Sequence, residues 1–218
     1  MEALSLVLGA AIIEAMNLEL KPLKRADEPQ VVRFAVDGMH FDHYIKSARL
    51  QRAYAGHFWL ASKMEATEQI ALYSGEVLAG VLLARMIGGV AVGVPPLERV
   101  FVRTADALLH VVSRKLEGAY QRANERLLSR FLLRYTAEGE ITFLAVNPAL
   151  KRQGVGRQLV EELATRHEGK RVYVFSDEEC DFGFYDHMRF TKEEEEAVSL
   201  VCSTGRMVLP CFLYSKVL

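Results

Sequence analysis

Residues 141–157 read ITFLAVNPALKRQGVGR, and this stretch decides how the rest of the chain is interpreted. Its first six residues form a near-continuous apolar run, which is typical of a strand covered on both faces. Asn147 and Pro148 end the run, because proline lacks the amide hydrogen that a strand ladder needs. Apolar residues then recur at helical spacing after Gly156. The stretch therefore predicts a buried strand, a short loop and a turn that opens a helix.

Two glycines, Gly154 and Gly156, lie where that helix is expected to begin. Glycine allows the backbone to close tightly around a ligand, and the first amides of a helix point outward at the positive end of its dipole. Lys151, Arg152 and Arg157 add full positive charge around the same turn. The turn is therefore expected to bind an anion, most simply a phosphate or a pyrophosphate.

Two well-known phosphate loops do not fit this turn. The dinucleotide-binding fingerprint needs a third glycine three residues after the second, but position 159 is Leu159. The Walker loop needs Gly-Lys-Ser/Thr, whereas Gly156 is followed by Arg157 and Gln158. The sequence therefore disfavours a nucleotide-dependent kinase or dehydrogenase.

The turn does resemble the acetyl-CoA loop of the GCN5-related N-acetyltransferase (GNAT) superfamily. The family pattern Gln/Arg-x-x-Gly-x-Gly/Ala stands here as residues 151–156, KRQGVG, with Val146-Asn147-Pro148 ahead of it. Lys151 replaces the usual first Gln or Arg. This departure is mild, because the family's loop contacts phosphate largely through its backbone.

A second block, at the expected distance downstream, supports the resemblance. Residues 171–176 (RVYVFS) are β-branched or aromatic and predict a strand. Residues 180–190 (CDFGFYDHMRF) resemble the family's second motif, a short helix that carries Phe-Tyr and ends at a Gly-Phe pair. Phe184-Tyr185 and Phe190 match this motif. The departures stand at Glu178, Asp181 and Arg189, where the family often has Asn, Ala and Gly.

The resemblance implies an α/β (α+β) fold, with a GNAT-like mixed, mostly antiparallel central sheet flanked by helices. It implies direct transfer of an acetyl group from acetyl-CoA to a primary amine, without a metal. Backbone groups of the predicted strand would pair with the pantetheine arm, and the amides of the turn would bind the pyrophosphate. The expected cofactor-binding residues are Leu144, Val146, Lys151, Arg152, Gln153, Gly154, Val155, Gly156 and Arg157.

The resemblance also implies two catalytic side chains. Tyr185 would protonate the departing CoA thiolate, since an unperturbed phenol has a pKa of about 10 and stays protonated at neutral pH. Phe184 and Phe190 beside it are explained as well by core packing. Glu140, at the head of the predicted strand, is the candidate general base. An exposed strand-end carboxylate explains Glu140 equally well.

Along the chain, the pattern predicts a first strand at 18–23, helices at 27–36 and 41–64, and a hairpin over 69–85 around Ser74-Gly75. Residues 97–135 are mostly helix-forming and contain no proline, so they are expected to form a helical insertion before the cofactor-binding strand. Two strands are expected at 198–202 and 207–214. Pro210 suggests a bulge or an edge position in the second one. The whole chain, 1–218, is expected to fold as one domain.

Charges are patterned in two places. Arg122, Arg126, Arg130 and Arg134 recur every four residues and would lie along one face of the insertion. This stripe is either a solvated face or a contact near the acceptor entrance for an acidic acceptor, a protein partner, a homodimer mate or the cofactor's phosphates. Residues 193–196, four glutamates, are expected to form a solvated loop or strand edge.

The bulk composition fits an enzyme of ordinary globular type. A formal net charge of -1 disfavours general nucleic-acid binding. Three cysteines without metal-type spacing indicate reduced thiols, and the six histidines show no ligand spacing. Residues 4–13 are apolar but too short to span a bilayer, and they are expected to be buried. These features predict a cytoplasmic protein without a membrane partner.

Two alternatives from other classes remain open at this stage. One is a degenerate acyl-CoA-binding or protein-interaction module that keeps the fold without turnover. The other is an adaptor whose arginine stripe contacts nucleic acid or an acidic protein. Both glycines and Tyr185 favour the enzyme over the first, and the near-neutral charge disfavours the second. The acceptor, a small-molecule or protein amine, is not identified by the sequence.

Overall fold

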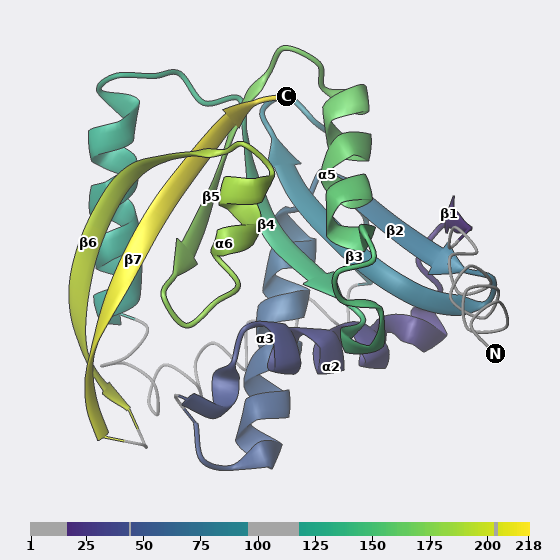
Figure 1. Ribbon diagram of the computed structural model, residues 1–218, viewed down its shortest axis with the longest axis horizontal. Coiled ribbons are helices and arrows are strands. Elements are labelled where there is room, and N and C mark those ends of the chain that lie inside the picture. The colour runs from purple at the N-terminus through teal and green to yellow at the C-terminus, as the bar shows by residue number, and fades with distance from the viewer. Residues whose placement is uncertain (1–16, 44, 96–117, 203–204) are drawn as a thin grey trace, which may run out of the picture.

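The strands form one mixed, mostly antiparallel sheet in a computed structural model that describes residues 17–43, 45–95, 118–202 and 205–218 (Figure 1). Neighbouring strands run in the order β1-β2-β3-β4-β5-β7-β6. Their bounds are β1 Leu18–Leu20, β2 Glu68–Ser74, β3 Val77–Met86, β4 Gly139–Val146, β5 Arg171–Asp177, β6 Thr191–Cys202 and β7 Gly205–Val217. The apolar segment at 4–13 and residues 97–117 of the expected insertion lie outside the described residues.

Helices cover both faces of this sheet. The longer ones are α2 (Glu28–Gly38), α3 (Ala48–Glu65), α5 (Val155–Arg166) and a helix over 118–132, which we call the insertion helix. The shorter ones are α6 (Gly183–His187) and the 3-10 turns η1 (Arg25–Asp27), η2 (Phe41–His43) and η3 (Pro148–Leu150). Among the described residues, no helix is both long and apolar enough to cross a membrane. The predicted mixed sheet with flanking helices and a helical insertion is confirmed.

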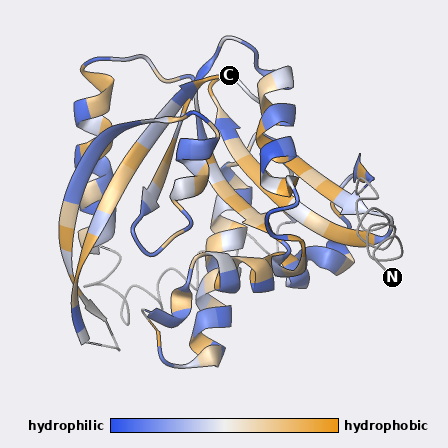
Figure 2. Cartoon of the chain, in the orientation of Figure 1, coloured by the Kyte–Doolittle hydropathy of each residue, from blue (hydrophilic) through white to orange (hydrophobic). Residues whose placement is uncertain are grey.

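Three apolar clusters hold the layers together. The first packs α5 against the sheet through Leu159, Val160 and Leu163. The second joins α2 and α3 to the opposite face, where Trp59 packs edge-on against Phe143 of β4. Figure 2 shows hydrophobic residues concentrated along β2 and β3, two of the strands that contribute to both clusters. Burial on both faces explains why these strands read as continuous apolar runs.

The third cluster attaches the insertion helix to β5, β6 and β7. Ala123, Leu127 and Phe131 of this helix are fully buried against the sheet. Their partners include Tyr173 of β5 and Leu213 of β7. Tyr173 lies on the face of the sheet opposite to α5, so the insertion helix covers the same face as α2 and α3.

Three of the predicted boundaries are corrected by the structure. The helix expected over 41–64 begins only at Ala48, because Ser47 has an extended backbone and residues 41–43 form η2. The last two strands are longer than predicted and include residues 193–196. Pro210 lies in β7 between β5 and β6, not at an edge. The Pro210 carbonyl accepts a hydrogen bond from the N–H of Glu178, the first residue after β5. The N–H that proline lacks would therefore face the point where β5 ends, so no hydrogen bond of the ladder is lost there.

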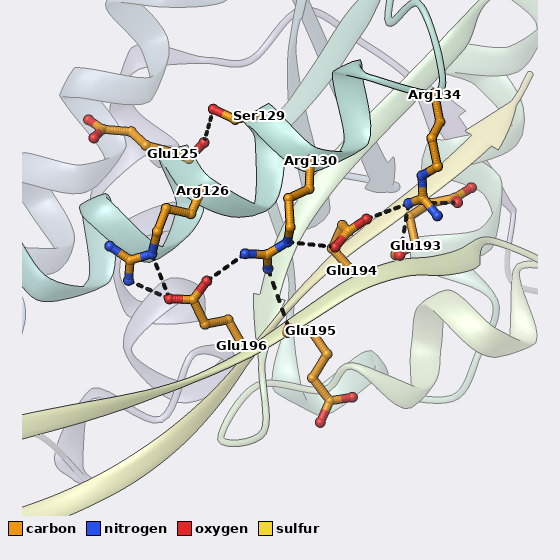
Figure 3. Close-up of polar contacts among 9 residues, drawn as sticks. All are labelled: Glu125, Arg126, Ser129, Arg130, Arg134, Glu193, Glu194, Glu195 and Glu196. Carbon is orange, nitrogen blue, oxygen red and sulfur yellow. Dashed lines mark hydrogen bonds and ion pairs between the residues drawn. The ribbon is translucent and has the colours of Figure 1, made fainter.

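The four glutamates lie on the edge strand β6, one of the two positions expected for them, but they and the arginines are not merely solvated, because the two segments bind each other (Figure 3). Arg130 donates to Glu194 at 2.8 Å and to Glu196 at 2.9 Å. Arg126 Nε donates to Glu196 at 2.7 Å, and Arg134 pairs with Glu194. The stripe therefore fastens the insertion helix to β6, and these three arginines do not line the central cavity described below.

The most consequential feature of the sheet is that β4 and β5 diverge. These two strands are parallel and pair only at Gly139–Val172 and Glu140–Tyr173. On the other side of β4, Leu83 pairs with Phe143 and Ala84 with Ile141, so Thr142 is an extra, bulged residue. A bulge bends its strand and increases the local twist. Beyond Glu140, no strand in the described part of the chain pairs with the edge of β4 that faces β5.

Candidate active site

A cavity of about 1750 Å³ opens where β4 and β5 separate. It is lined by β4, the 150–157 turn, β5 and α6, and also by parts of α3 and the insertion helix. The loop and α6 residues that the sequence singled out all contribute to this one cavity, although Gly154 and Tyr185 lie far apart along the chain. We refer to it as the central cavity.

The N-terminus of α5 forms one wall of the central cavity. Gly154 stands at the cap position with a φ of 83°, a left-handed conformation that favours glycine. The first helical bond runs from the Gln158 N–H to the Gly154 carbonyl, so the amides of residues 155–157 have no partner within the helix. Gly154, as a glycine, has no side chain that could cap them. This is the anion-binding geometry that the sequence predicted, and Lys151, Arg152, Gln153 and Arg157 line the cavity beside it.

The exposed edge of β4 forms a second wall. Asn147 donates its N–H to Ala79 on β3 at 2.8 Å, so its backbone points away from β5. Because successive residues of a strand alternate, Val146 and Leu144 direct their N–H and C=O groups toward the gap. These are the two residues expected to pair with an extended, amide-containing ligand. Both line the cavity.

Gly156 is required for a reason that the sequence did not indicate. A Cβ built on Gly156 would lie 3.0 Å from Cε2 and 3.2 Å from Cζ of the Phe184 ring. The glycine therefore lets α5 approach α6 closely, in addition to any contact with a ligand. Gly80 of β3 has a similar role, since a Cβ there would lie 2.9 Å from Val155 at the start of α5. Sequence reasoning missed Gly80, because a lone glycine within a strand has several explanations.

Tyr185 lies on α6 and lines the central cavity. Its ring is half-buried and packs against Phe184, Phe190 and Tyr214, with ring centroids 5.4, 5.5 and 5.6 Å away. Burial raises the pKa of the Tyr185 phenol above its ordinary value of 10.0, and the nearby Cys180 and Asp181 act in the same direction. The phenol therefore stays protonated at neutral pH.

Glu140 is held by two partners and is not the exposed carboxylate that was one of its two readings. Arg85 donates to Glu140 at 2.6 Å and the Tyr173 hydroxyl donates at 3.0 Å. The Glu140 side chain is 16% exposed. Burial raises the pKa of Glu140 above its ordinary value, while Arg85 and the Tyr173 hydroxyl act against that shift. Arg85 also binds Glu65, so two carboxylates share one guanidinium at this end of the cavity.

The structure adds functional candidates that sequence reasoning missed. Asp177, at the end of β5, is only 6% exposed and lines the central cavity. It accepts hydrogen bonds from the Tyr120 hydroxyl at 3.1 Å and from the N–H groups of Glu179 and Cys180 at 3.0 and 3.1 Å. Tyr120 belongs to the insertion helix, and nothing in the sequence pairs it with a residue 57 positions away.

The structure brings together one group of potential metal ligands, although the histidines of the sequence show no spacing typical of a metal site. His40, Asp42 and His43 bring one ligand atom each to within 4.8 Å of one another. Asp42 and His43 are exposed, and His43 Nδ1 already pairs with Glu179. No other such group occurs in the part of the chain that the structure describes. These contacts alone do not assign a metal to this group.

Comparison with known proteins agrees with this arrangement. Residues 116–187, which span the insertion helix, β4, α5, β5 and α6, match the family model of the GNAT acetyltransferases. No curated protein matches the sequence.

Three solved structures are similar to this chain, and the likeness in fold rests on the first of them. An acetyltransferase from Thermus thermophilus is 13% identical with a TM-score of 0.52, covering 94% of this chain and 99% of that one. The ribosomal-protein-S18-alanine N-acetyltransferase from Escherichia coli is 13% identical with a TM-score of 0.47, covering 91% and 92%. NAA60 from Arabidopsis thaliana, solved with a bisubstrate analogue, is 11% identical with a TM-score of 0.48, covering 92% and 97%. The predicted resemblance is confirmed: the chain has the GNAT fold and a GNAT acetyltransferase match over residues 116–187.

Proposed function

We propose that this protein is an acetyl-CoA-dependent N-acetyltransferase that moves an acetyl group directly from the CoA thioester to a primary amine. The observation that carries this proposal is the central cavity. It joins an uncapped helix N-terminus, an unpaired strand edge and a protonated phenol. Each of these groups suits a different part of acetyl-CoA.

The binding roles follow from chemistry. Amides of residues 155–157 suit the pyrophosphate, because they lie at the positive end of the α5 dipole. Lys151, Arg152 and Arg157 supply positive charge around them. The pantetheine arm contains two amides, which suit the backbone groups of Leu144 and Val146 as an added strand would. Gln153, Gly154, Val155 and Gly156 shape the turn that holds these donors.

The transfer step has three requirements. The amine must lose a proton before its lone pair forms the new C–N bond at the thioester carbonyl. A β4 amide beside that carbonyl would stabilise the negative charge that develops on its oxygen. The C–S bond then breaks and the thiolate takes the Tyr185 proton. The amine gives its first proton to solvent, the proton that the nitrogen loses after the C–N bond forms goes to Glu140, and exchange with solvent restores both side chains.

Two further features fit this proposal. Cys180 and Cys211 carry no disulfide, which suits a reducing compartment such as the cytoplasm. The fold needs no metal for the chemistry above, because the charge on the carbonyl oxygen and the leaving sulfur is met by an amide and a phenol.

Calorimetry with acetyl-CoA tests the binding half of the proposal. Gly154→Ala places a side chain on a residue with a left-handed backbone that lines the central cavity. The control Gly75→Ala does the same in the β2–β3 turn, where Gly75 has a φ of 59° and does not line the cavity. Each should cost about 1–2 kcal/mol of stability, because a side chain disfavours that backbone region. Only Gly154→Ala should weaken acetyl-CoA binding. Unaltered affinity in folded Gly154→Ala would contradict the assignment.

Turnover tests the catalytic half. Tyr185→Phe keeps the ring packing and removes only the hydroxyl. If Tyr185 is the general acid, the rate of CoA release should fall about a hundredfold or more at nearly unchanged acetyl-CoA affinity. Tight acetyl-CoA binding with no transfer to any amine would instead indicate an acyl-CoA-binding module without activity.

A further inference from the structure

Among the described residues, the protein itself contacts two sides of the insertion helix, and a third side lines the central cavity. One side, with Ala123, Leu127 and Phe131, is buried against the sheet. A second side carries Arg126 and Arg130, and Arg134 follows just past the end of the helix; all three bind glutamates of β6 (Figure 3). The third side forms part of the wall of the central cavity, through Tyr120, Gln121, Asn124, Glu125 and Leu128.

Asn124 on this third side has an unmet hydrogen-bonding group. Its side-chain oxygen is buried and has no hydrogen-bond partner among the described residues. A buried acceptor without a donor is costly and is uncommon in folded proteins. Glu125, the residue after Asn124, accepts a hydrogen bond from Gln121 at 3.1 Å, and all three residues line the cavity. Figure 3 shows Glu125 pointing away from β6, opposite to the arginine side chains.

The charges of the central cavity are divided between its two ends. Lys151, Arg152 and Arg157 lie at the α5 end, where acetyl-CoA is proposed to bind. The other end, formed by α3, β3, β5 and the insertion helix, is mainly acidic. Among its described lining residues, one guanidinium accompanies four carboxylates: Arg85, with Glu65, Glu125, Glu140 and Asp177.

We propose that the acceptor is a cationic amine that carries a second ammonium or similar donor-rich group, and that the insertion helix recognises this second group through Asn124 and Glu125. This inference rests on the proposed function, since it names the acceptor class for the same cavity. An amide oxygen and a carboxylate both accept hydrogen bonds, and an ammonium offers three donors. An acidic or phosphate-bearing acceptor would meet repulsion at this end of the cavity.

The proposal reverses the expectation drawn from the arginine stripe. That stripe suggested an acidic acceptor, but Arg126, Arg130 and Arg134 pair with glutamates of β6, while Asn124 and Glu125 on another side of the helix line the cavity. The electrostatic field at the acceptor end of the cavity therefore depends on the side chains that face the cavity. It does not depend on the net charge of the insertion helix.

Three probes of equal reach test this idea: 1,4-diaminobutane, 1-aminopentane and 5-aminopentanoate. All present the same reacting amine on a four-carbon chain, and they differ only in an ammonium, a methyl or a carboxylate at the far end. We expect kcat/KM to be highest for the diamine and lowest for the amino acid. Raised salt should reduce the difference, because the charges in an open cavity are screened.

Two variants and one control locate the recognition. Glu125→Gln should lower the ratio of diamine to monoamine kcat/KM about two- to fivefold, as expected for an exposed charge pair. Asn124→Leu should lower the same ratio about five- to tenfold, the usual value of a hydrogen bond. Glu168→Gln removes an exposed carboxylate that does not line the cavity, so this control should leave the ratio unchanged.

Calorimetry with the three amines separates the two proposals. If acetyl-CoA fails to bind but the diamine binds more tightly than the amino acid, the proposed function is wrong and the cationic site stands. If the amino acid is bound or acetylated as well as the diamine, the acceptor class is wrong. An unchanged ratio in both Glu125→Gln and Asn124→Leu would likewise overturn the role of the insertion helix.

Discussion

The contact between Gly156 and Phe184 gives the sharpest prediction about how α5 and α6 build the site. Gly156→Ala would place a Cβ at 3.0–3.2 Å from two ring carbons of Phe184. Carbon atoms prefer a separation of about 3.5–4.0 Å, so either the ring or the start of α5 must move by roughly half an ångström. Because α6 carries Tyr185 next to Phe184, this movement would disturb the catalytic wall of the cavity as well as the turn.

The expected magnitude is modest. Overpacking of this kind costs about 1–3 kcal/mol. Replacing glycine by alanine within a helix returns about 0.5–1 kcal/mol. The net loss of stability is therefore about 1 kcal/mol, which corresponds to a fall in Tm of about 2–4 °C for a chain of this size.

A double-mutant cycle in thermal unfolding tests the contact. Phe184→Leu removes the ring carbons that the new Cβ would meet, so in that background Gly156→Ala should become neutral or slightly stabilising. The coupling between the two positions should be about 1–2 kcal/mol. Gly56→Ala in α3, where a Cβ meets nothing within 4 Å, is the matched control and should raise Tm. Acetyl-CoA affinity lost in Gly156→Ala should return in the double variant. Additivity within about 0.5 kcal/mol would refute the argument.

Two further predictions concern the pKa of two glutamates, Glu140 in the central cavity and Glu196 on β6. If Glu140 is the general base, kcat/KM should fall on acidification as Glu140 is protonated. Arg85→Met removes a cation that opposes the raised pKa of Glu140, so this limb of the pH profile should move to higher pH. Hydrogen bonds from Arg126 and Arg130 lower the pKa of Glu196, so their contribution to stability is present above the ordinary glutamate pKa and is lost as pH falls through the lowered value. Tm should therefore fall less between about pH 5 and pH 3 in Arg130→Gln than in the wild-type protein. An equal fall in Tm in the two proteins would show that these ion pairs do not contribute to stability.

The turn at 151–157 could be predicted from the sequence because its geometry is local. Glycine spacing, the start of an apolar helix and the preceding strand all lie within seventeen residues, so Gly154 was expected at the start of a helix. The direction of the Leu144 and Val146 backbone could be anticipated only through the family resemblance. The bulge at Thr142 has no such local signal, because it depends on how β4 pairs with a strand that ends more than fifty residues earlier.

The contacts of the insertion helix could not be predicted for the same reason. A spacing of four residues shows that Arg126, Arg130 and Arg134 share a face, but it does not show what that face meets. Their partners lie 60–70 residues later, in a strand whose start the sequence pattern did not locate. The arginines and the glutamates are two runs of opposite charge in one near-neutral chain, and each run taken alone indicates only a solvated face or an external partner. Considering them together would have suggested the pairing.

The divergence of β4 and β5 explains why the insertion helix has both a structural and a binding side. Where the strands separate, the sheet exposes its unpaired β4 edge and the apolar face of β5 and β7 next to it. A helix that covers Tyr173 and Leu213 on that face must lie beside the opening, since Tyr173 is the last residue of β5 that still pairs with β4. The side of the helix next to the opening then becomes a wall of the cavity. Acceptor recognition by this helix is thus a geometric consequence of covering the sheet at the point where it splits.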